Sequence, residues 1–123
     1  MAKLQYSNQE IGVLGEEIAT NFLIQKGWTI CERNWRYKHL EVDIIAFDGK
    51  ILRIVEVKLR SSIQYGYPEE RIMKDKMKHL KVAAQIYQQK NPQYKLIQFD
   101  VVSILYQRNK VQEIFYFEDV YIY

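Results

Sequence analysis

Apolar residues recur at two different periods along the chain, and these periods predict helices and strands in a definite order. Apolar positions three and four residues apart predict one helix over residues 9–26 and a second over about residues 69–90. Runs rich in Ile and Val predict strands over residues 28–37, 41–47, 50–59, 96–105 and 111–117. The order helix, three strands, helix, strand predicts a single α/β domain over residues 1–123, with a mixed four- to five-stranded sheet flanked by helices.

The two strands at the centre of this pattern are joined at Asp48-Gly49. Asp-Gly between apolar runs predicts a tight hairpin, because a type I′ turn needs positive φ at both central residues. With a two-residue loop, Phe47 faces Lys50 and Glu41 faces Glu56. One face of the hairpin is then apolar near the turn and charged at the far end, and it carries Glu41, Asp43, Ile45, Phe47, Leu52, Ile54, Glu56 and Lys58. The other face looks like plain core and carries Val42, Ile44, Ala46, Ile51, Val55, Val57 and Leu59.

Three carboxylates at one end of an apolar face need a counter-charge, since close like charges cannot all remain ionised. Lys58 supplies only part of the balance, and a divalent cation would supply the rest. Carboxylate oxygens are the ligands that Mg²⁺ (or Mn²⁺) prefers, and such sites commonly bind the cation together with phosphate oxygens. The pattern indicates metal-assisted phosphodiester chemistry. The alternative is that Glu41 and Glu56 lie on an exposed face and pair with Lys58 and Lys50.

Asp43, followed on the next strand by Glu56-Val57-Lys58, resembles the active-site signature of the PD-(D/E)XK nuclease superfamily, which includes restriction endonucleases and archaeal Holliday-junction resolvases. Further blocks in the same order resemble the YraN-like family of small bacterial proteins. They are Gly15-Glu16, Arg33-Asn34-Trp35-Arg36, Glu41 to Ala46, Val55 to Ser61 and Phe99 to Val102. These blocks cover about residues 10–105. The short Asp…Glu-x-Lys pattern also arises by chance, whereas the full ordered set is specific.

This resemblance implies a restriction-endonuclease-like core and Mg²⁺-dependent cleavage of a nucleic-acid backbone, with branched or damaged DNA as candidate substrates. By resemblance, Asp43 and Glu56 would hold the metal with the Val57 carbonyl, and Glu16 would assist through water. Lys58 would orient the attacking water, and Glu41 would support these ligands or join a second metal. The alternative is a non-catalytic nucleic-acid-binding module of the same fold.

Basic residues near the predicted site suggest phosphate contacts. Arg36 is interleaved with aromatic residues, and Arg60 and Ser61 begin a loop over residues 60–68. The second helix carries a basic stripe, and the resemblance adds Lys76 to it. The helical residues concerned are Arg71, Lys74, Lys76, Lys78 and Lys81. The alternative is that these side chains are simply solvated. Asp100, inside an apolar strand, needs a partner, for which Arg60 or a basic helix residue is expected.

Composition narrows the context without deciding the function. The 123-residue chain has 48% hydrophobic residues and a net charge of +3, which permits a nucleic-acid partner. The resemblance to the nuclease superfamily implies DNA as that partner more readily than RNA. It has no apolar run long enough to span a membrane and no signal peptide, and lone Cys31 cannot form an internal disulfide. These features are typical of a cytoplasmic protein with no membrane association. The Tyr-rich end, residues 116–123, could cover a sheet edge or form a homodimer contact.

Overall fold

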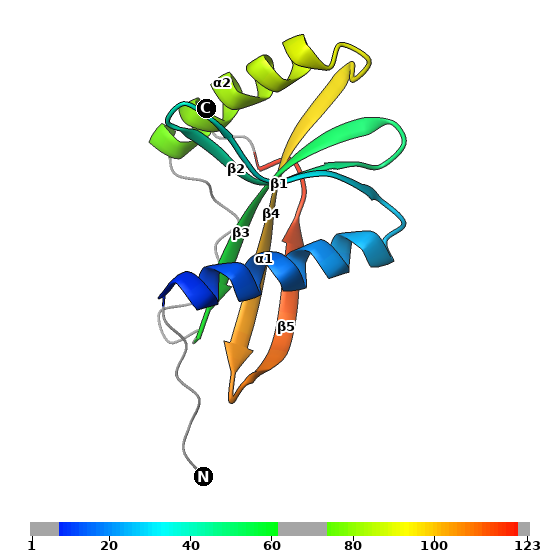
Figure 1. Ribbon diagram of the computed structural model, residues 1–123. Coiled ribbons are helices and arrows are strands. Elements are labelled where there is room, and N and C mark those ends of the chain that lie inside the picture. The colour runs from blue at the N-terminus through cyan, green and yellow to red at the C-terminus, as the bar shows by residue number, and fades with distance from the viewer. Residues whose placement is uncertain (1–7, 62–73, 121–123) are drawn as a thin grey trace.

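The computed structural model describes residues 8–61 and 74–120, and its elements follow the predicted order (Figure 1). They are α1 (Asn8–Gln25), β1 (Thr29–Tyr37), β2 (Leu40–Phe47), β3 (Ile51–Arg60), α2 (Lys74–Lys90), β4 (Leu96–Gln107) and β5 (Lys110–Phe117). The predicted loop beyond Ser61 and the predicted start of the second helix, with Arg71, lie outside the described residues. So do the last three tyrosine-rich positions, residues 121–123. Neither of the two described helices is long and apolar enough to cross a bilayer.

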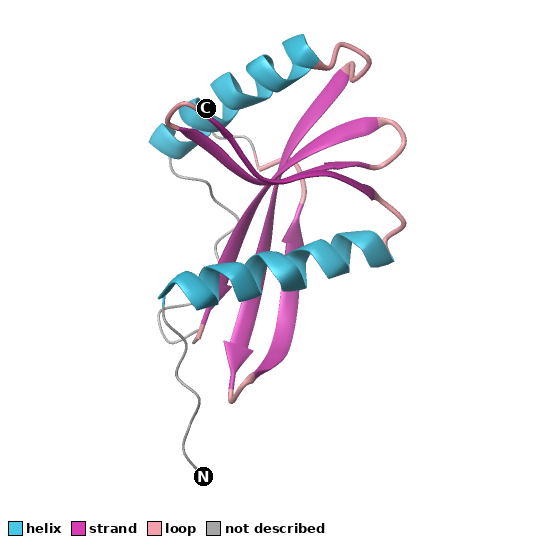
Figure 2. Cartoon of the chain, in the orientation of Figure 1, coloured by secondary structure: helices cyan, strands magenta, loops and turns pink. Residues whose placement is uncertain are grey.

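The five described strands form one mixed sheet in the order β1-β2-β3-β4-β5. β3 and β4 are parallel because α2 lies between them in the chain and returns it to the same end of the sheet, whereas the other neighbours are antiparallel. The two helices lie on opposite faces of the sheet (Figure 2). This confirms the predicted α/β fold, which is consistent with a restriction-endonuclease-like core.

Each face of the sheet buries its own apolar cluster. The α1-side core contains Ala19, Leu23, Ile44, Ala46, Val55, Val102 and Ile104. The α2-side core contains Leu40, Val42, Ile45, Leu52, Ile54, Met77, Leu80, Ala83, Ala84, Tyr87, Val101 and Val120. Helix α1 approaches the sheet closely because small residues face it: a Cβ added to Gly15 would lie 3.4 Å from the Cβ of Leu59. This close approach places the first turns of α1 beside β3.

The β2–β3 hairpin turns one residue later than predicted. Phe47 pairs with Leu52 rather than Lys50, and only Gly49 has positive φ, at 100°. The Asp48 carboxylate accepts hydrogen bonds from the N–H groups of Lys50 at 2.8 Å and Ile51 at 2.7 Å, which fixes the turn around Gly49. The pairing therefore moves by two residues. An even shift keeps each side chain on its face, so Ile45, Ile54 and their neighbours remain together.

The predicted faces are wrong at the start of β2. Val42 belongs to the α2-side core, whereas Ile44 belongs to the α1-side core, so strict alternation fails at Asp43. The opposite strand is irregular at the same level, because Asn34 adopts a left-handed φ of 51° between the paired residues Arg33 and Trp35. Asp43 therefore lies at a break in the pleat, not on the regular face with Ile45.

Asp100 is fully buried, and its partner differs from the expected one. Arg53 on the adjacent strand donates to Asp100 Oδ2 at 3.2 Å, and the Tyr116 hydroxyl donates to the same oxygen. The parallel register sets Val55 beside Asp100, so Arg53, two residues earlier, lies on the same face. Arg53 also pairs with Asp48 at 2.8 Å. Asp100 thus has the structural role predicted, with Arg53 instead of Arg60 or a helix residue as its partner.

Candidate functional site

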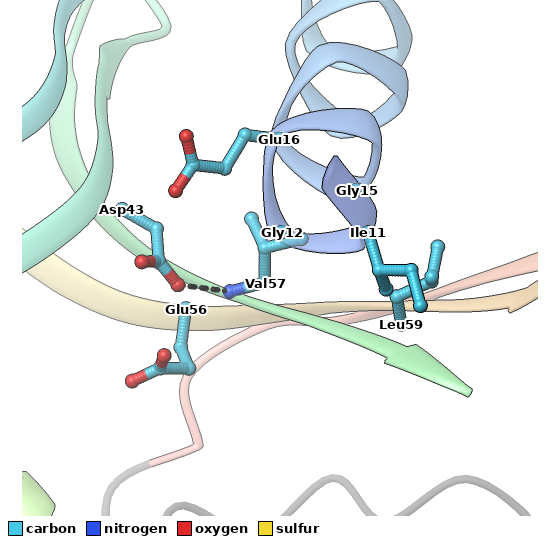
Figure 3. A pocket seen from close by; sticks show the side chains of 8 residues that line it. All are labelled: Ile11, Gly12, Gly15, Glu16, Asp43, Glu56, Val57 and Leu59. Carbon is cyan, nitrogen blue, oxygen red and sulfur yellow. Dashed lines mark hydrogen bonds between the residues drawn. The ribbon is translucent and has the colours of Figure 1, made fainter. Parts of the chain in front are cut away.

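A pocket opens where β2 and β3 separate. The regular pairing of the two strands reaches Ile44 and Val55, and beyond it the Val57 N–H donates to Asp43 Oδ2 at 2.8 Å. At this point between the two strands, a side-chain oxygen accepts the hydrogen bond that a backbone carbonyl accepts in regular strand pairing. The pocket has a volume of about 310 Å³ and is lined by Ile11, Gly12, Gly15, Glu16, Asp43, Glu56, Val57 and Leu59 (Figure 3). We call it the acidic pocket.

Residues of three elements bring acidic groups to the acidic pocket: Glu16 from α1, Asp43 from β2 and Glu56 from β3. Figure 3 shows the Asp43 carboxylate between Glu16, on the α1 side of β3, and the Glu56 carboxylate, which points to the other side of that strand, where Lys76 of α2 pairs with it. Ile11, Gly12 and Gly15 supply the rest of the helical wall, and the two glycines have no side chains to cover the carboxylates. The structure therefore brings together four of the residues predicted from sequence: Glu16, Asp43, Glu56 and Val57.

Glu56 is the most perturbed of these acids. Its side chain is 15% exposed, and its Oε2 atom is buried without a hydrogen-bond partner. Burial, followed by the nearby Asp43 carboxylate, raises the pKa of Glu56 to about 8, against the opposing effect of Lys76. The Lys76 ammonium lies 3.6 Å from Oε2, which is an ion-pair distance but a long one. Ionised Glu56 is therefore only partly compensated by the protein itself.

The acidic pocket fits a hard divalent cation on chemical grounds. A buried carboxylate oxygen without a hydrogen-bond partner, beside a second carboxylate, is an environment that a cation would stabilise. Among residues 8–61 and 74–120, however, no three His, Cys, Asp or Glu side chains converge closely enough to hold an ion. Two carboxylates and the Val57 carbonyl would be the protein ligands. Such a short set suits Mg²⁺, which usually retains waters and substrate phosphate oxygens.

Glu41, predicted as a further metal ligand, lies in an adjoining pocket of about 440 Å³. This second pocket is lined by Gly12, Val13, Glu16, Asn34, Arg36 and Glu41, and we call it the hairpin pocket. Glu41 pairs there with Arg36, at 3.4 Å between Oε1 and Nη2. The two pockets share Gly12 and Glu16. Burial raises the pKa of Glu16, while a side-chain hydrogen bond with Asn34 opposes the rise.

Lys58 does not line either pocket. Strand alternation places Lys58 on the same face as Glu56, two residues along β3. In the register of the sheet, Lys58 lies opposite Ser103 of β4. Arg60 and Ser61 lie at the end of β3, where Gln107 donates to the Ser61 carbonyl at 2.6 Å. On α2, Lys74 and Lys78 are exposed and Lys81 is half-buried, whereas Lys76 turns to Glu56.

Sequence reasoning missed Gly12, Val13 and Asn34 as parts of a site. Val13 was recognised only as a residue of the predicted first helix, and Gly12 as a small helical neighbour of Glu16. Asn34 belonged to a predicted strand and to the block Arg33-Asn34-Trp35-Arg36 that carries the resemblance. The one available signal was Asn34 itself, since Asn adopts the left-handed conformation more readily than other non-glycine residues. The pocket that these residues share depends on how α1 crosses the strands, which no local pattern encodes.

Comparisons with known proteins confirm the resemblance to the YraN-like family. Residues 15–104 match the family described as "Uncharacterised protein family UPF0102". A UPF0102 protein of Dictyoglomus thermophilum is 41% identical over 100 residues, which is 80% of this chain and 85% of the relative. A UPF0102 protein of Flavobacterium psychrophilum is 38% identical over 114 residues, 93% of this chain and 95% of the relative. One from Caldicellulosiruptor saccharolyticus is 44% identical over 102 residues, 80% and 84% of the two chains. The chain belongs to the UPF0102 family, the YraN-like proteins.

Proposed function

We propose that this protein is a Mg²⁺-dependent nuclease of the PD-(D/E)XK type, acting on the phosphodiester backbone of DNA. The observation that carries the proposal is Glu56: a buried, poorly compensated carboxylate with a pKa near 8, in one pocket with Asp43 and Val57. An ionised carboxylate in such surroundings lowers the stability of the folded protein. Acids with perturbed pKa values in clefts are characteristic of active sites, which indicates that Glu56 serves a function. The α/β fold and the order Asp43, Glu56, Lys58 support the same superfamily.

The metal would be held by the carboxylates of Asp43 and Glu56 and the Val57 carbonyl. When bound, the cation supplies Lewis acidity toward a phosphate oxygen and lowers the pKa of a coordinated water. Asp43 is already oriented, because the Val57 N–H holds its Oδ2 atom at 2.8 Å. Little reorganisation of this ligand is needed on binding, which favours catalysis by a preorganised site.

Two lysines have separate roles in this proposal. Lys58, on the Glu56 face of β3, orients the attacking water and offsets charge on the pentavalent phosphorus. Lys76 pairs with Glu56, at 3.6 Å between Nζ and Oε2. A cation at Glu56 would take over that neutralising role and leave Lys76 available for a phosphate oxygen. Lys74 and Lys78, exposed along α2, add non-specific phosphate contacts. Arg36, Arg60, Ser61 and Lys81 remain candidates for the same task.

The test is a cleavage assay on single-stranded, duplex, flapped and four-way-junction DNA, and on RNA of matched sequence, with Mg²⁺ or Mn²⁺. Asp43→Asn, Glu56→Gln and Lys58→Met should each lower the cleavage rate by about 100-fold or more, the scale seen when a charge-stabilising group is removed. Glu17→Gln is the matched control, because Glu17 is an exposed α1 acid that pairs with Arg33 outside both pockets. Absence of metal-dependent cleavage on every substrate would refute the nuclease proposal.

The second candidate is a non-catalytic nucleic-acid-binding module. It is favoured by the fact that three acids do not converge on an ion within the described part of the chain, and that Lys76 already pairs with Glu56. Under this alternative the protein binds the same DNA with an affinity that is independent of Mg²⁺. Binding by electrophoretic mobility shift, with no cleavage after long incubation with Mg²⁺ or Mn²⁺, would select it.

A further inference from the structure

The hairpin pocket is built from groups whose chemistry differs from that of a phosphate site. Arg36 on β1 and Glu41 on β2 are directly paired across the hairpin, and Gly12, Val13 and Glu16 form the opposite wall. The Arg36 guanidinium therefore shares this pocket with two carboxyl groups, those of Glu16 and Glu41. The Arg36 guanidinium is balanced by the Glu41 carboxylate, at 3.4 Å between Nη2 and Oε1. This balance disfavours an anion and favours a neutral ligand that offers both hydrogen-bond donors and an acceptor.

Both members of the Arg36–Glu41 pair keep free hydrogen-bonding capacity. The side chains are 71% and 43% exposed, and their single contact, at 3.4 Å, uses one nitrogen and one oxygen. Arginine has five N–H donors and an ionised carboxylate has two acceptor oxygens, so most of both sets faces the pocket or solvent. Val13, 58% exposed, adds an apolar surface against which a flat ring could lie.

Gly12 has no packing reason to be glycine. A Cβ built there meets no atom within 4 Å, in contrast to Gly15, which touches Leu59. Glycine inside a helix also lowers helix stability relative to alanine. What glycine gives at this position is open space in the wall that the hairpin pocket shares with the acidic pocket. A ligand that occupies both pockets would pass over Gly12.

We propose that the hairpin pocket binds an unpaired guanine adjacent to the scissile phosphate. The Glu41 carboxylate would accept hydrogen bonds from guanine N1–H and N2–H, and Arg36 would donate to O6. This edge is accessible only when the base is not in a Watson–Crick pair, and proteins commonly read single-stranded bases in this way. Gly12 and Glu16, the residues of the shared wall, lie about one helical turn apart, or about 5.4 Å, so a base and a phosphate bound on its two sides would belong to the same or to neighbouring nucleotides. The inference rests on the proposed function in one respect, that the ligand is a nucleic acid.

The inference is tested without metal or cleavage. Amide chemical shifts of the isotope-labelled protein are followed by NMR in EDTA during titration with 5′-GMP, 5′-AMP, 5′-CMP, 5′-UMP and 5′-IMP. 5′-GMP should bind at least about tenfold more tightly than 5′-AMP, the discrimination expected of a bidentate base contact. 5′-IMP, which lacks the 2-amino group, should bind more weakly than 5′-GMP. The shifts should centre on Gly12, Val13, Asn34, Arg36 and Glu41.

Two variants separate this site from general nucleotide attraction. Glu41→Gln replaces one acceptor oxygen by an NH₂ group, which would face an N–H donor of guanine. Gly12→Leu places a side chain over the wall that the two pockets share. Each variant should weaken 5′-GMP binding about tenfold or more. Glu17→Gln, in the Arg33–Glu17 pair outside both pockets, should leave it unchanged. Equal affinity for all five nucleotides, no saturable binding, or equal behaviour of the Glu41 and Glu17 variants would overturn the proposal. Cleavage without guanine binding would refute this site alone, and guanine binding without cleavage would refute the nuclease alone.

Discussion

Replacing Glu56 by Gln should stabilise the metal-free protein at alkaline pH, even though it removes a proposed catalytic group. The glutamine side chain has nearly the same shape but carries no charge. It therefore avoids the cost of placing an ionised carboxylate, 15% exposed, beside Asp43. The variant tests the electrostatics of the acidic pocket without requiring that any substrate be known.

The size of the effect follows from the pKa of Glu56. It rises from an ordinary 4.5 to about 8, so in this window the folded state binds more protons than the unfolded state. The free energy of unfolding of the wild-type protein therefore falls as pH rises through the window, and the loss is complete above the folded-state pKa. At about 1.4 kcal/mol per pKa unit, the full loss is of order 5 kcal/mol, shared with Asp43 as a coupled pair.

The assay is thermal unfolding of wild type and Glu56→Gln in EDTA at about pH 5 and about pH 9. The two proteins should have similar Tm values at the acidic pH. At the alkaline pH the variant should melt roughly 10 °C or more above wild type, since about 1 kcal/mol corresponds to several degrees in a domain of this size. Saturating Mg²⁺ should raise the Tm of wild type and not of the variant.

Glu17→Gln serves as the control, because that acid is exposed on α1 and forms only a surface pair with Arg33. Equal Tm values for wild type and Glu56→Gln at both pH values would refute the reasoning, since Glu56 would then ionise without cost. A Mg²⁺-dependent Tm increase in the variant equal to that of wild type would show that any bound cation lies elsewhere.

The remaining predictions concern the metal, the helices, the buried ion pair and the basic stripe. Mg²⁺ binding near pH 7 should release close to one proton from Glu56, measured as the buffer dependence of calorimetric heats, and a release of zero would contradict a protonated Glu56. In urea unfolding, Gly12→Ala should stabilise the protein by about 0.5–1 kcal/mol, because an added Cβ meets no atom there. Gly15→Val should destabilise it by about 1–3 kcal/mol, because the valine side chain would meet Leu59. Equal effects of the two variants would contradict the close approach of α1 to the sheet. Arg53→Met should cost about 3–5 kcal/mol by leaving Asp100 buried without its counter-charge, and a neutral result in urea unfolding would contradict that pairing. Lys78→Gln should lower the salt slope of DNA binding by about one, and an unchanged slope would remove α2 from the interface.

Much of the fold was predictable because its information is local. The helical period predicted α1, and the two apolar runs around Asp48-Gly49 predicted β2 and β3, each to within a few residues of the observed bounds. Strand alternation grouped Asp43 with Glu56, and both line the acidic pocket, although Asp43 lies at a break in the pleat and is held beside β3 by the Val57 N–H. The register itself was missed: Asp48 binds the N–H groups of Lys50 and Ile51, and this side-chain capping competes with a type I′ turn.

The features that sequence reasoning missed depend on tertiary structure. The break in the pleat at Asp43 coincides with the left-handed Asn34 on the neighbouring strand, and Arg53 meets Asp100 through the parallel register of β3 and β4. Likewise, Glu41 was grouped with Asp43 because alternate residues of a regular strand share a face. Its position opposite Arg36 separates it into the hairpin pocket.

Anomalous X-ray diffraction from crystals soaked in Mn²⁺ would locate a cation bound by Asp43 and Glu56. We expect one strong peak within about 2.0–2.4 Å of carboxylate oxygens of both residues and close to the Val57 carbonyl, the range of hard-cation ligand distances. The peak should be absent from Glu56→Gln crystals soaked in the same way. A peak at other residues, or no peak in wild-type crystals at a Mn²⁺ concentration that supports cleavage, would contradict this expectation.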